Sequence, residues 1–526
     1  MSAVERAEPR PLDAAPGASQ VVILGPARTW LIGFSIFFAV LAAWSLATPK
    51  FAAPDEPAHA ARAASLVRGQ LLGRPLSGNP SDPRVAVRIP LNLVPTNIGC
   101  FIFRPSQPAS CARVTSPLPD LRTVSTYTGR YPPLYYLAVG VPSLWASGGR
   151  VLWWMRLGGD VVNAVLLTAA FLIAGRSTNS VWALVGVAAA TTPMVLFLGS
   201  VVNPSGLEIC SAVTLWSALL ALTRSPGGQR SPAVAIWAAA SAVVFESTRG
   251  LSPVLMVLTV AAACAAAPPG WVRRLLRRRQ VRIGGAVVAA FGVLAVAWIV
   301  GAGTLRLMRV STVPASVTTP DLVRLVLGDN TQFDQFVGRF GWLDTRSPTW
   351  VVYLWAVALC ALVAAVIHRR QWRVLTVLGA LAAASVVIPT VEGVVQARTV
   401  GLFSQARYIM PLAVGLPILA GAALSLGRWL SAGKGQLVLG ALAAAQLAAF
   451  WAALQRYRFG TPRRLPPRYG PWNPPLNASV LLTVMVVALI ALQLWYATLV
   501  RRPDSTPRRP RTSRASTVAT GPTPGR

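Results

Sequence analysis

Long runs of apolar residues recur along the chain, separated by more polar segments. The first run extends from Trp30 to Ala47. A helix of about 20 apolar residues is long enough to cross the hydrocarbon core of a bilayer. Eleven further runs of similar length follow, at residues 157–175, 180–199, 206–223, 232–247, 251–267, 283–304, 349–367, 374–392, 408–426, 435–454 and 477–499. The pattern predicts an all-α polytopic membrane protein with about 12 transmembrane helices.

Another apolar run, at residues 131–147, is harder to interpret. It contains Pro132, Pro133 and Pro142 and is followed by two glycines, and prolines interrupt helices. We interpret it as a surface or re-entrant helix; if it spans the membrane, the number of spans becomes about 13. With this interpretation, residues 48–156 form one long extracytoplasmic loop that carries surface helices.

Basic residues in short loops set the predicted orientation, because cytoplasmic loops carry an excess of lysine and arginine. The clusters at 271–279 and 368–373 and the tail after Arg501 are therefore placed in the cytoplasm. Counting back from these loops puts both termini inside. The same count puts the loops at 305–348 and 393–407 outside, together with the long first loop.

Composition supports this class of protein: 54% of the residues are hydrophobic and 12% are charged. The formal net charge of +33 would suggest nucleic acid in a soluble chain. Here much of it lies at span ends and in the tail, where membrane orientation and anionic lipids account for it, so no nucleic-acid partner is expected. Residues 1–27 and 500–526 are predicted to be disordered cytoplasmic ends that flank a membrane domain at 28–499.

The positions of the cysteines are consistent with the predicted membrane orientation. Cys100 and Cys111 lie in the first outer loop, whereas Cys210, Cys264 and Cys360 lie in apolar runs. Paired loop cysteines that face an oxidising compartment predict a disulfide; two free thiols are the alternative.

The segment that begins at Pro54 contains several candidate catalytic residues close together. Asp55 and Glu56 directly follow the first span. Asp55 has the position of a helix N-cap, since a proline in the first turn favours a helix start there. In the helix that follows, Asp55, His59 and Arg62 share one face. The sequence therefore predicts a short amphipathic helix on the membrane surface with its polar face toward water. A capped helix start without function is the alternative.

Other polar residues stand near the predicted outer ends of spans. Asn203 and Glu208 lie where one span begins, in the arrangement of an N-cap and a first-turn acid. Glu246 and Arg249 flank the break between two spans, and a mutual ion pair is the simplest interpretation of them. Charges at membrane depth are costly, so a functional role stays open.

Two outer loops contain the segments Phe340–Asp344 and Gln405–Tyr408. Trp342 and Tyr408 fit an interfacial aromatic belt. Arg407 also suits a phosphate ligand, because a guanidinium group binds phosphate through paired N–H bonds. The chain lacks a P-loop, a glycine-rich dinucleotide motif and a His-Glu-x-x-His motif, so ATP-driven, nicotinamide-dependent and zincin chemistry have no support.

Taken together, these segments resemble the GT-C superfamily of membrane glycosyltransferases. In detail the chain is similar to a bacterial family of predicted membrane proteins catalogued as a domain of unknown function. The matching segments are Pro54–His59, the Cys100/Cys111 pair, Tyr131–Tyr136 leading to Arg156, Asn203–Glu208, Phe340–Asp344 and Gln405–Tyr408. Ser205 and Ala406 depart from the pattern, at positions where we expect an acidic or amide residue and a glycine; these departures concern substrate details.

The resemblance implies transfer of a sugar from a polyprenyl-phosphate-linked donor to an envelope glycan, lipid or protein on the outer face of a bacterial plasma membrane. It implies Asp55 as general base, with Glu56 and His59 in support, and Arg407 and Arg249 on the donor phosphate. The substrate-binding candidates are Tyr131, Tyr135, Asn203, Glu208, Trp342, Asp344 and Tyr408. Some GT-C enzymes use a divalent cation such as Mg²⁺ or Mn²⁺, but the sequence does not indicate which residues would bind it. A lipid-linked sugar flippase and a non-catalytic envelope-assembly protein are the alternatives.

Overall fold

The computed structural model describes residues 25–500, apart from 80–81, 113–115, 117, 179, 225–230, 315, 329–330, 403–404, 426–430 and 462–469. Of the predicted disordered ends, 1–24 and 501–526 lie outside the described residues. Pro26 is already the first residue of a helix.

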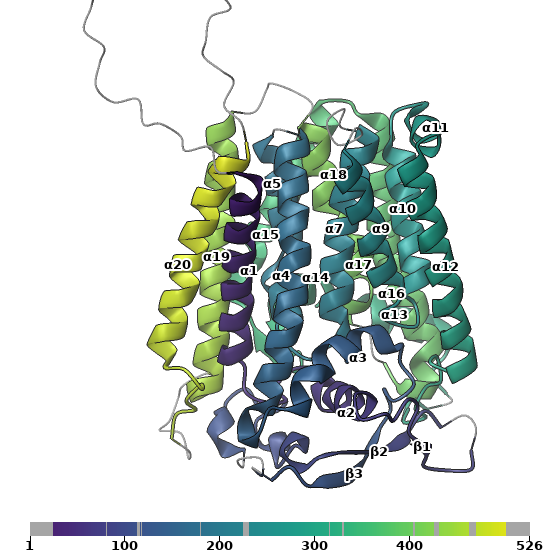
Figure 1. The fold of residues 1–526 in the computed structure, drawn as a ribbon, viewed down its shortest axis with the longest axis vertical. Coiled ribbons are helices and arrows are strands. Elements are labelled where there is room, and N and C mark those ends of the chain that lie inside the picture. The colour runs from purple at the N-terminus through teal and green to yellow at the C-terminus, as the bar shows by residue number, and fades with distance from the viewer. Residues whose placement is uncertain are drawn as a thin grey trace, which may run out of the picture.

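Helices stand side by side in one bundle (Figure 1). Among the described residues, eight are long and apolar enough to cross a membrane singly. These are α1 (Pro26–Ala47), α4 (Val151–Thr178), α7 (Pro204–Arg224), α12 (Arg279–Ala302), α15 (Thr349–His368), α16 (Trp372–Val400), α19 (Ala432–Phe459) and α20 (Ala478–Leu499). Helix α7 is almost wholly buried at the centre, whereas α12 at one edge is largely exposed. The exposed apolar surface of α12 is what lipid contact requires.

The remaining predicted spans are helical but shorter or bent. Helices α5 (Val181–Ala190) and α6 (Pro193–Gly199) form a pair bent by 63°. The bend follows from Pro193, and Thr192 caps the second half through a bond from Val195 N. The short apolar helices are α9 (Pro232–Glu246), α10 (Ser252–Ala266) and the consecutive α17 (Met410–Ala413) and α18 (Gly415–Leu424). All the predicted apolar runs are therefore helical, and the polytopic all-α prediction is confirmed.

An outer layer built mainly from the first loop covers the lower end of the bundle (Figure 1). It contains α2 (Glu56–Leu66), α3 (Pro133–Gly140) and a sheet of β1 (Arg74–Pro75), β2 (Val85–Pro90) and β3 (Leu121–Thr126). The strands are antiparallel in the order β1-β2-β3, with Val87 opposite Val124. The short helices η1 (Leu91–Leu93), η2 (Ile98–Cys100), η3 (Ala109–Cys111), η4 (Val141–Leu144) and η5 (Gly148–Arg150) complete it. The surface helices were predicted; the small sheet was not.

Helix α3 lies against α2 at this end of the bundle, as expected for a surface helix (Figure 1). Gly140 makes the close crossing possible, since a Cβ there would lie 2.5 Å from the carbonyl oxygen of Ala63. The second outer loop adds α13 (Thr319–Gly328), α14 (Gln332–Gly338), β4 (Arg339–Phe340) and β5 (Thr345–Arg346). A single turn, η6 (Ala406–Tyr408), precedes α17.

The disulfide between Cys100 and Cys111 is formed, with their Cα atoms 6.1 Å apart. It joins η2 to η3 and so closes the part of the outer layer that holds Phe103. The prediction from loop cysteines is confirmed.

Both described ends and the arginine-rich α11 (Trp271–Leu276) lie at the upper end of the bundle, opposite the outer layer (Figure 1). With the upper end in the cytoplasm, Arg277→Cys should be shielded from a membrane-impermeant maleimide in intact cells. Arg88→Cys, on an exposed position of β2, should be labelled. The unsubstituted chain sets the background. Labelling of Arg277→Cys before the membrane is opened would contradict this orientation.

Candidate functional site

Asp55 lies in the turn between α1 and α2, directly before the first residue of α2. Its backbone is left-handed, with φ of 59°, a conformation that aspartate adopts more readily than most residues. The helix begins where the sequence predicted, but the carboxylate makes no capping bond. It accepts a hydrogen bond of 2.6 Å from the hydroxyl of Tyr127 and forms an ion pair with Arg407. Asp55 therefore occupies the predicted N-cap position, but its side chain pairs with other residues and does not cap the helix.

Opposing effects set the pKa of the Asp55 carboxyl. Burial raises the pKa, but the charge of Arg407 and the hydrogen bond from Tyr127 lower it, and the result is about 2. Burial and the neighbouring carboxylate raise the pKa of Tyr127, so this hydroxyl keeps its proton and donates it. Asp55 is thus ionised but weakly basic while paired, and 22% of its side chain stays exposed.

The polar face of α2 is buried, not turned toward water as predicted. His59 Nδ1 lies 2.8 Å from the hydroxyl of Tyr136, which comes from α3. Arg62 donates to the carbonyl oxygens of Leu71 and Tyr131, at 2.6 and 3.0 Å. The amphipathic pattern was correct, but the outer layer and α3 cover the side that the sequence assigned to solvent.

Burial and the charges of Arg407 and Arg249 together lower the pKa of His59 to about 3, against the opposing effect of Asp55. The imidazole is therefore neutral at physiological pH. Together with its bond to Tyr136, this makes His59 a packing and positioning group of the α2–α3 contact.

Glu56 points away from Asp55 into the protein. It is fully buried and forms a two-pronged ion pair with Arg156 of α4, with N···O distances of 2.7 and 2.6 Å. The same guanidinium group donates to the carbonyl oxygens of Ser45, Thr48 and Pro49 at the end of α1. Glu56 therefore fixes the turn that carries Asp55.

Two arginines enclose the ring of Tyr408. The guanidinium carbons of Arg249 and Arg407 lie 4.6 and 5.1 Å from its centroid. Arg407 also donates to the Tyr408 hydroxyl at 3.2 Å, but its Nε and Nη1 are buried without a hydrogen-bond partner. The cluster therefore holds positive charge and free N–H groups beside Asp55.

Arg249 is 3.6 Å from Glu208 and 3.1 Å from the Ser205 hydroxyl, both in α7. The Ser252 hydroxyl donates to Glu208 at 2.6 Å. The suggested pair of Arg249 with Glu246 is wrong; Glu246 Oε1 is buried without a partner. Ser205, a departure from the family pattern, thus reaches the arginine cluster directly.

The other predicted binding residues fall into two groups. Tyr131 lies among the cluster, since Arg249, Tyr408, Asp55 and Arg407 all act on the pKa of its hydroxyl, which burial raises. Tyr135 and Asn203 lie outside it. Tyr135 is buried toward the carbonyl of Val201. Asn203 caps α7 through Ser205 N and donates to the carbonyl of Pro54 at 2.9 Å, so it supports the Asp55 turn.

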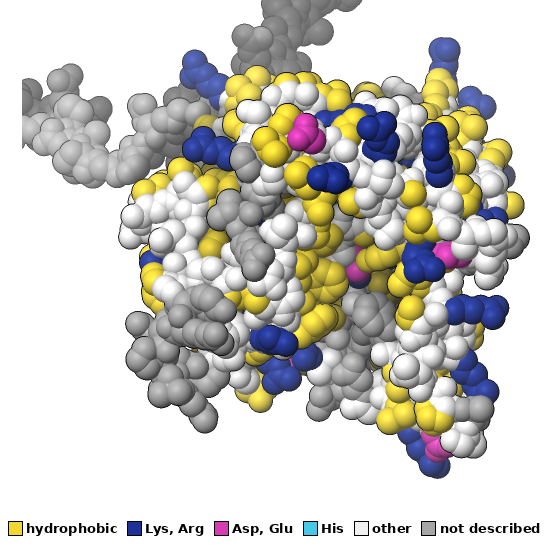
Figure 2. Space-filling model, turned by 90° about the horizontal axis from the view of Figure 1, so that it is seen from below, with side chains coloured by type: hydrophobic (Ala, Val, Ile, Leu, Met, Phe, Trp, Pro, Cys, Tyr) yellow, Lys and Arg dark blue, Asp and Glu magenta, His cyan; other side chains and the backbone are white. Residues whose placement is uncertain are grey.

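Asp55 also lines a cavity of about 440 Å³ that is partly open to the surface. Trp342 lines the cavity, and Asp344 lies behind the wall, bonded to Arg456 at 3.1 Å and to Phe103 N at 3.0 Å. The full lining is Pro54, Asp55, Phe103, Arg339, Trp342, Leu343 and Gln405. Figure 2 shows the outer face from below, hollowed near its middle, with hydrophobic side chains along the hollow and basic ones around it.

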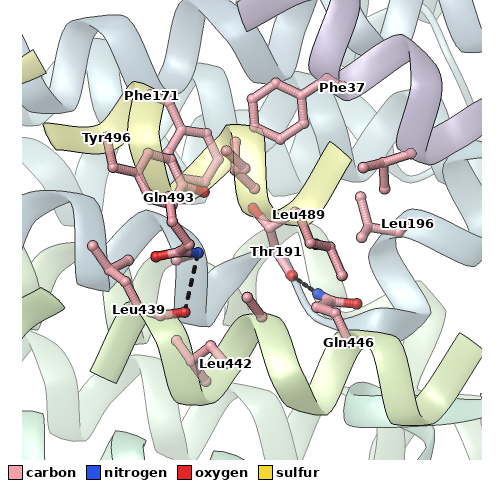
Figure 3. Close-up of a pocket in the computed structure, with 14 residues that line it drawn as sticks. Phe37, Phe171, Thr191, Leu196, Leu439, Leu442, Gln446, Leu489, Gln493 and Tyr496 are labelled. Atoms are coloured by element: carbon pink, nitrogen blue, oxygen red, sulfur yellow. Dashed lines mark hydrogen bonds between the residues drawn. The ribbon is translucent and has the colours of Figure 1, made fainter. Parts of the chain in front are cut away.

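A second cavity lies within the bundle and is lined by residues of α1, α4, α5, α6, α19 and α20 (Figure 3). It has a volume of about 30 Å³ and is lined mainly by apolar side chains. Gln446 Nε2 donates to the carbonyl of Thr191 at 2.7 Å, as Figure 3 shows. The volume suits a water molecule at most, so this cavity is no candidate for substrate chemistry.

Among the described residues, no group of three or more histidine, cysteine, aspartate or glutamate side chains is placed to hold a metal ion. The charges beside Asp55 are arginines, which repel a cation. The donor set here therefore does not fit a divalent cation, and no step proposed below runs through one.

Sequence reasoning did not choose several residues of the site, among them Tyr127, Phe103 and Gln405. Tyr127 stands one residue after β3 and close to the Tyr131–Tyr136 segment, which was the available signal. Phe103 lies between the bridged cysteines, and Gln405 belongs to a matched segment but was not chosen. Their roles depend on partners far away in the chain.

The sequence matches the family described as "Predicted membrane protein (DUF2142)" over residues 38–416. No curated protein sequence matches it. Among solved structures, the crystal structure of ArnT from Cupriavidus metallidurans in the apo state is similar, with a TM-score of 0.44 and 16% sequence identity. The similarity covers 90% of this chain and 77% of that one.

Proposed function

The chain belongs to the DUF2142 family of predicted membrane proteins, and we propose that it is a glycosyltransferase. It transfers a sugar from a polyprenyl-phosphate-linked donor to a cell-envelope acceptor, which is a glycan, lipid or protein. The reaction takes place on the extracytoplasmic face of a bacterial plasma membrane, with both termini in the cytoplasm.

One observation carries this proposal. The carboxylate of Asp55 is paired with Arg407, which belongs to a cluster of positive charge, and Asp55 also lines an open cavity of about 440 Å³. Asp55 alone belongs both to that ion pair and to the cavity lining. A base that contacts both an anion-binding group and an open cavity suits transfer from a phosphate-linked donor to a hydroxyl acceptor.

The arginine cluster supports the donor end. Arg249 lies between α9 and α10, and Arg407 lies just before α17, so both stand at the outer ends of apolar helices. A lipid carrier places its phosphate at that level, with its tail in the bilayer. The free Nε and Nη1 of Arg407 offer the paired N–H geometry that phosphate oxygens accept.

In the proposed reaction an acceptor hydroxyl oxygen attacks the anomeric carbon of the donor sugar. The bond from that carbon to the phosphate oxygen breaks, and its electron pair leaves with the polyprenyl phosphate. Asp55 takes the proton of the hydroxyl. Arg407 and Arg249 stabilise the negative charge that develops on the leaving phosphate.

The ion pair of Asp55 with Arg407 couples binding of the donor phosphate to proton transfer by Asp55. While Arg407 holds Asp55, the pKa of that carboxyl is about 2 and the carboxylate is a weak base. A donor phosphate competes for the same guanidinium group. Once Arg407 turns to the phosphate, the remaining effect of burial raises the pKa of Asp55, so donor binding activates the base.

Supporting roles follow from the contacts. Tyr127 orients Asp55, and the Glu56–Arg156 pair and Asn203 fix its turn. Glu208 and Ser205 hold Arg249, while Tyr408 and Tyr131 line the donor side.

Comparison of a deletion strain with its parent tests the proposal. We expect a missing envelope glycan and accumulation of a carrier-linked sugar on the outer leaflet, because the donor is made but not used. Accumulation confined to the inner leaflet would identify a flippase instead. An unchanged pool of lipid-linked sugars with altered envelope assembly would identify a non-catalytic role.

A further inference from the structure

The cavity beside Asp55 is walled by four segments that are distant in sequence. They are the turn before α2, the loop between η2 and η3, the hairpin of β4 and β5, and the residue before η6. Its volume of about 440 Å³ is within the range of roughly 300–1,000 Å³ found for small-molecule sites.

Gln405 lines this cavity and has an unpaired hydrogen-bonding group. Its side chain is 6% exposed, and its Oε1 is buried without a hydrogen-bond partner. Leaving a buried amide oxygen unpaired costs free energy. A polar ligand that pairs with this amide would remove that cost.

Aromatic side chains form another part of the wall. The indole of Trp342 is held by a hydrogen bond of 3.1 Å from Nε1 to the carbonyl of Phe51, and its ring lies 5.9 Å from that of Phe103. Phe103 is 67% exposed although it is a large apolar residue. Its backbone is left-handed, with φ of 59°, and Asp344 holds its N–H at 3.0 Å. A strained backbone conformation of this kind persists where surrounding contacts enforce it. The contacts of Phe103 therefore hold its ring in the exposed position.

The hydrogen-bonding groups point to one ligand class. Asp55 offers a carboxylate, which accepts hydrogen bonds from hydroxyl groups, and Arg339 adds a guanidinium group to the same lining. Trp342 and Phe103 offer apolar ring faces, which pack against the C–H face of a sugar ring. A molecule with several hydroxyl groups around a ring with an apolar face can make both kinds of contact at once.

We propose that this cavity is the acceptor subsite and that it binds a sugar ring of a glycan, with Trp342 and Phe103 against the ring and Gln405 bonded to a ring substituent. The inference rests on the proposed transferase function for the identity of the ligand as an acceptor. It places the acceptor on one side of Asp55 and the donor phosphate on the other.

Binding without turnover tests the subsite separately from the reaction. The protein in nanodiscs is titrated with methyl glycosides of glucose, galactose and mannose, and saturation-transfer NMR reports contact with ring protons. We expect at least one glycoside to bind in the millimolar range. The Gln405→Leu and Phe103→Ala variants should each weaken that binding about fivefold to tenfold. Phe103→Ala changes an exposed side chain, so it keeps the test valid if Gln405→Leu folds poorly.

Trp145→Ala is the matched control, because this residue is 70% exposed and lies outside the cavity lining. It should bind the glycoside like the unsubstituted protein. Absence of binding by every glycoside, or equal binding in all variants, would overturn the subsite. Binding of N-acetylserine amide but of no glycoside would overturn the glycan assignment. Glycoside binding with no transfer in membranes would count against the proposed reaction and leave the sugar subsite standing.

Discussion

Asp55→Asn is expected to lower sugar transfer by about 10²- to 10⁴-fold per folded molecule, the usual contribution of a positioned general base. Asparagine has nearly the same size and also adopts the left-handed backbone of this position. Its side-chain oxygen can still accept the hydrogen bond from Tyr127. It cannot take the proton of the acceptor hydroxyl, so the loss falls on the chemical step. The measurement is transfer from a polyprenyl-phosphate-linked donor in membranes, normalised to folded protein.

Removing the charge of Asp55 also leaves Arg407 without its ion-pair partner, so some stability should be lost. Asp82→Asn is the matched control, because it breaks another ion pair of the first loop, with Arg84, at a residue outside the cavity lining. It should preserve transfer per folded molecule. Glu56→Gln should destabilise most, since loss of one partner from a fully buried pair costs about 3–5 kcal/mol. Near-normal transfer by Asp55→Asn would remove Asp55 as the base.

Arg407→Ala is expected to lower transfer by about 10²- to 10³-fold, the range seen when one stabilising donor of a developing negative charge is removed. Arg407→Lys should lose less, because lysine keeps the charge but not the paired N–H geometry. Initial rates at varied donor and fixed acceptor concentrations measure the effect. Equal donor kinetics in the two variants and the unsubstituted protein would exclude Arg407 from the donor site.

The same substitution should change the pH dependence. In the unsubstituted protein the pKa of Asp55 is about 2, so its protonation does not limit kcat/KM between pH 5 and 7. In Arg407→Ala the largest lowering effect is gone and burial still raises the pKa. The acidic limb of the kcat/KM profile should therefore move to higher pH. Tyr127→Phe should move it in the same direction by a smaller amount, because one hydrogen bond to the carboxylate is lost.

Much of the fold followed from local pattern. The apolar runs at 157–175 and 349–367, for example, became α4 and α15 because hydrocarbon can be crossed only by chains that satisfy their own backbone hydrogen bonds. The Cys100–Cys111 disulfide followed from compartment and spacing. The sheet escaped notice, because its two longer strands, β2 and β3, are separated in sequence by the whole η1–η3 segment.

The sequence also indicated where the candidate site lies. Asp55 at the outer end of the first span and Arg407 before a later span were both predicted as site residues. It determined which helices form and which polar residues stand at their outer ends, since these depend on neighbours within a few turns. Only the tertiary structure decided that Asp55 is paired with Arg407, 352 residues away, and that Arg249 pairs with Glu208. It also decided that the polar face of α2 is covered, and that Gln405 faces a cavity. Ion pairs and cavities are made between distant segments, and helical periodicity carries no information about which segment covers a given face.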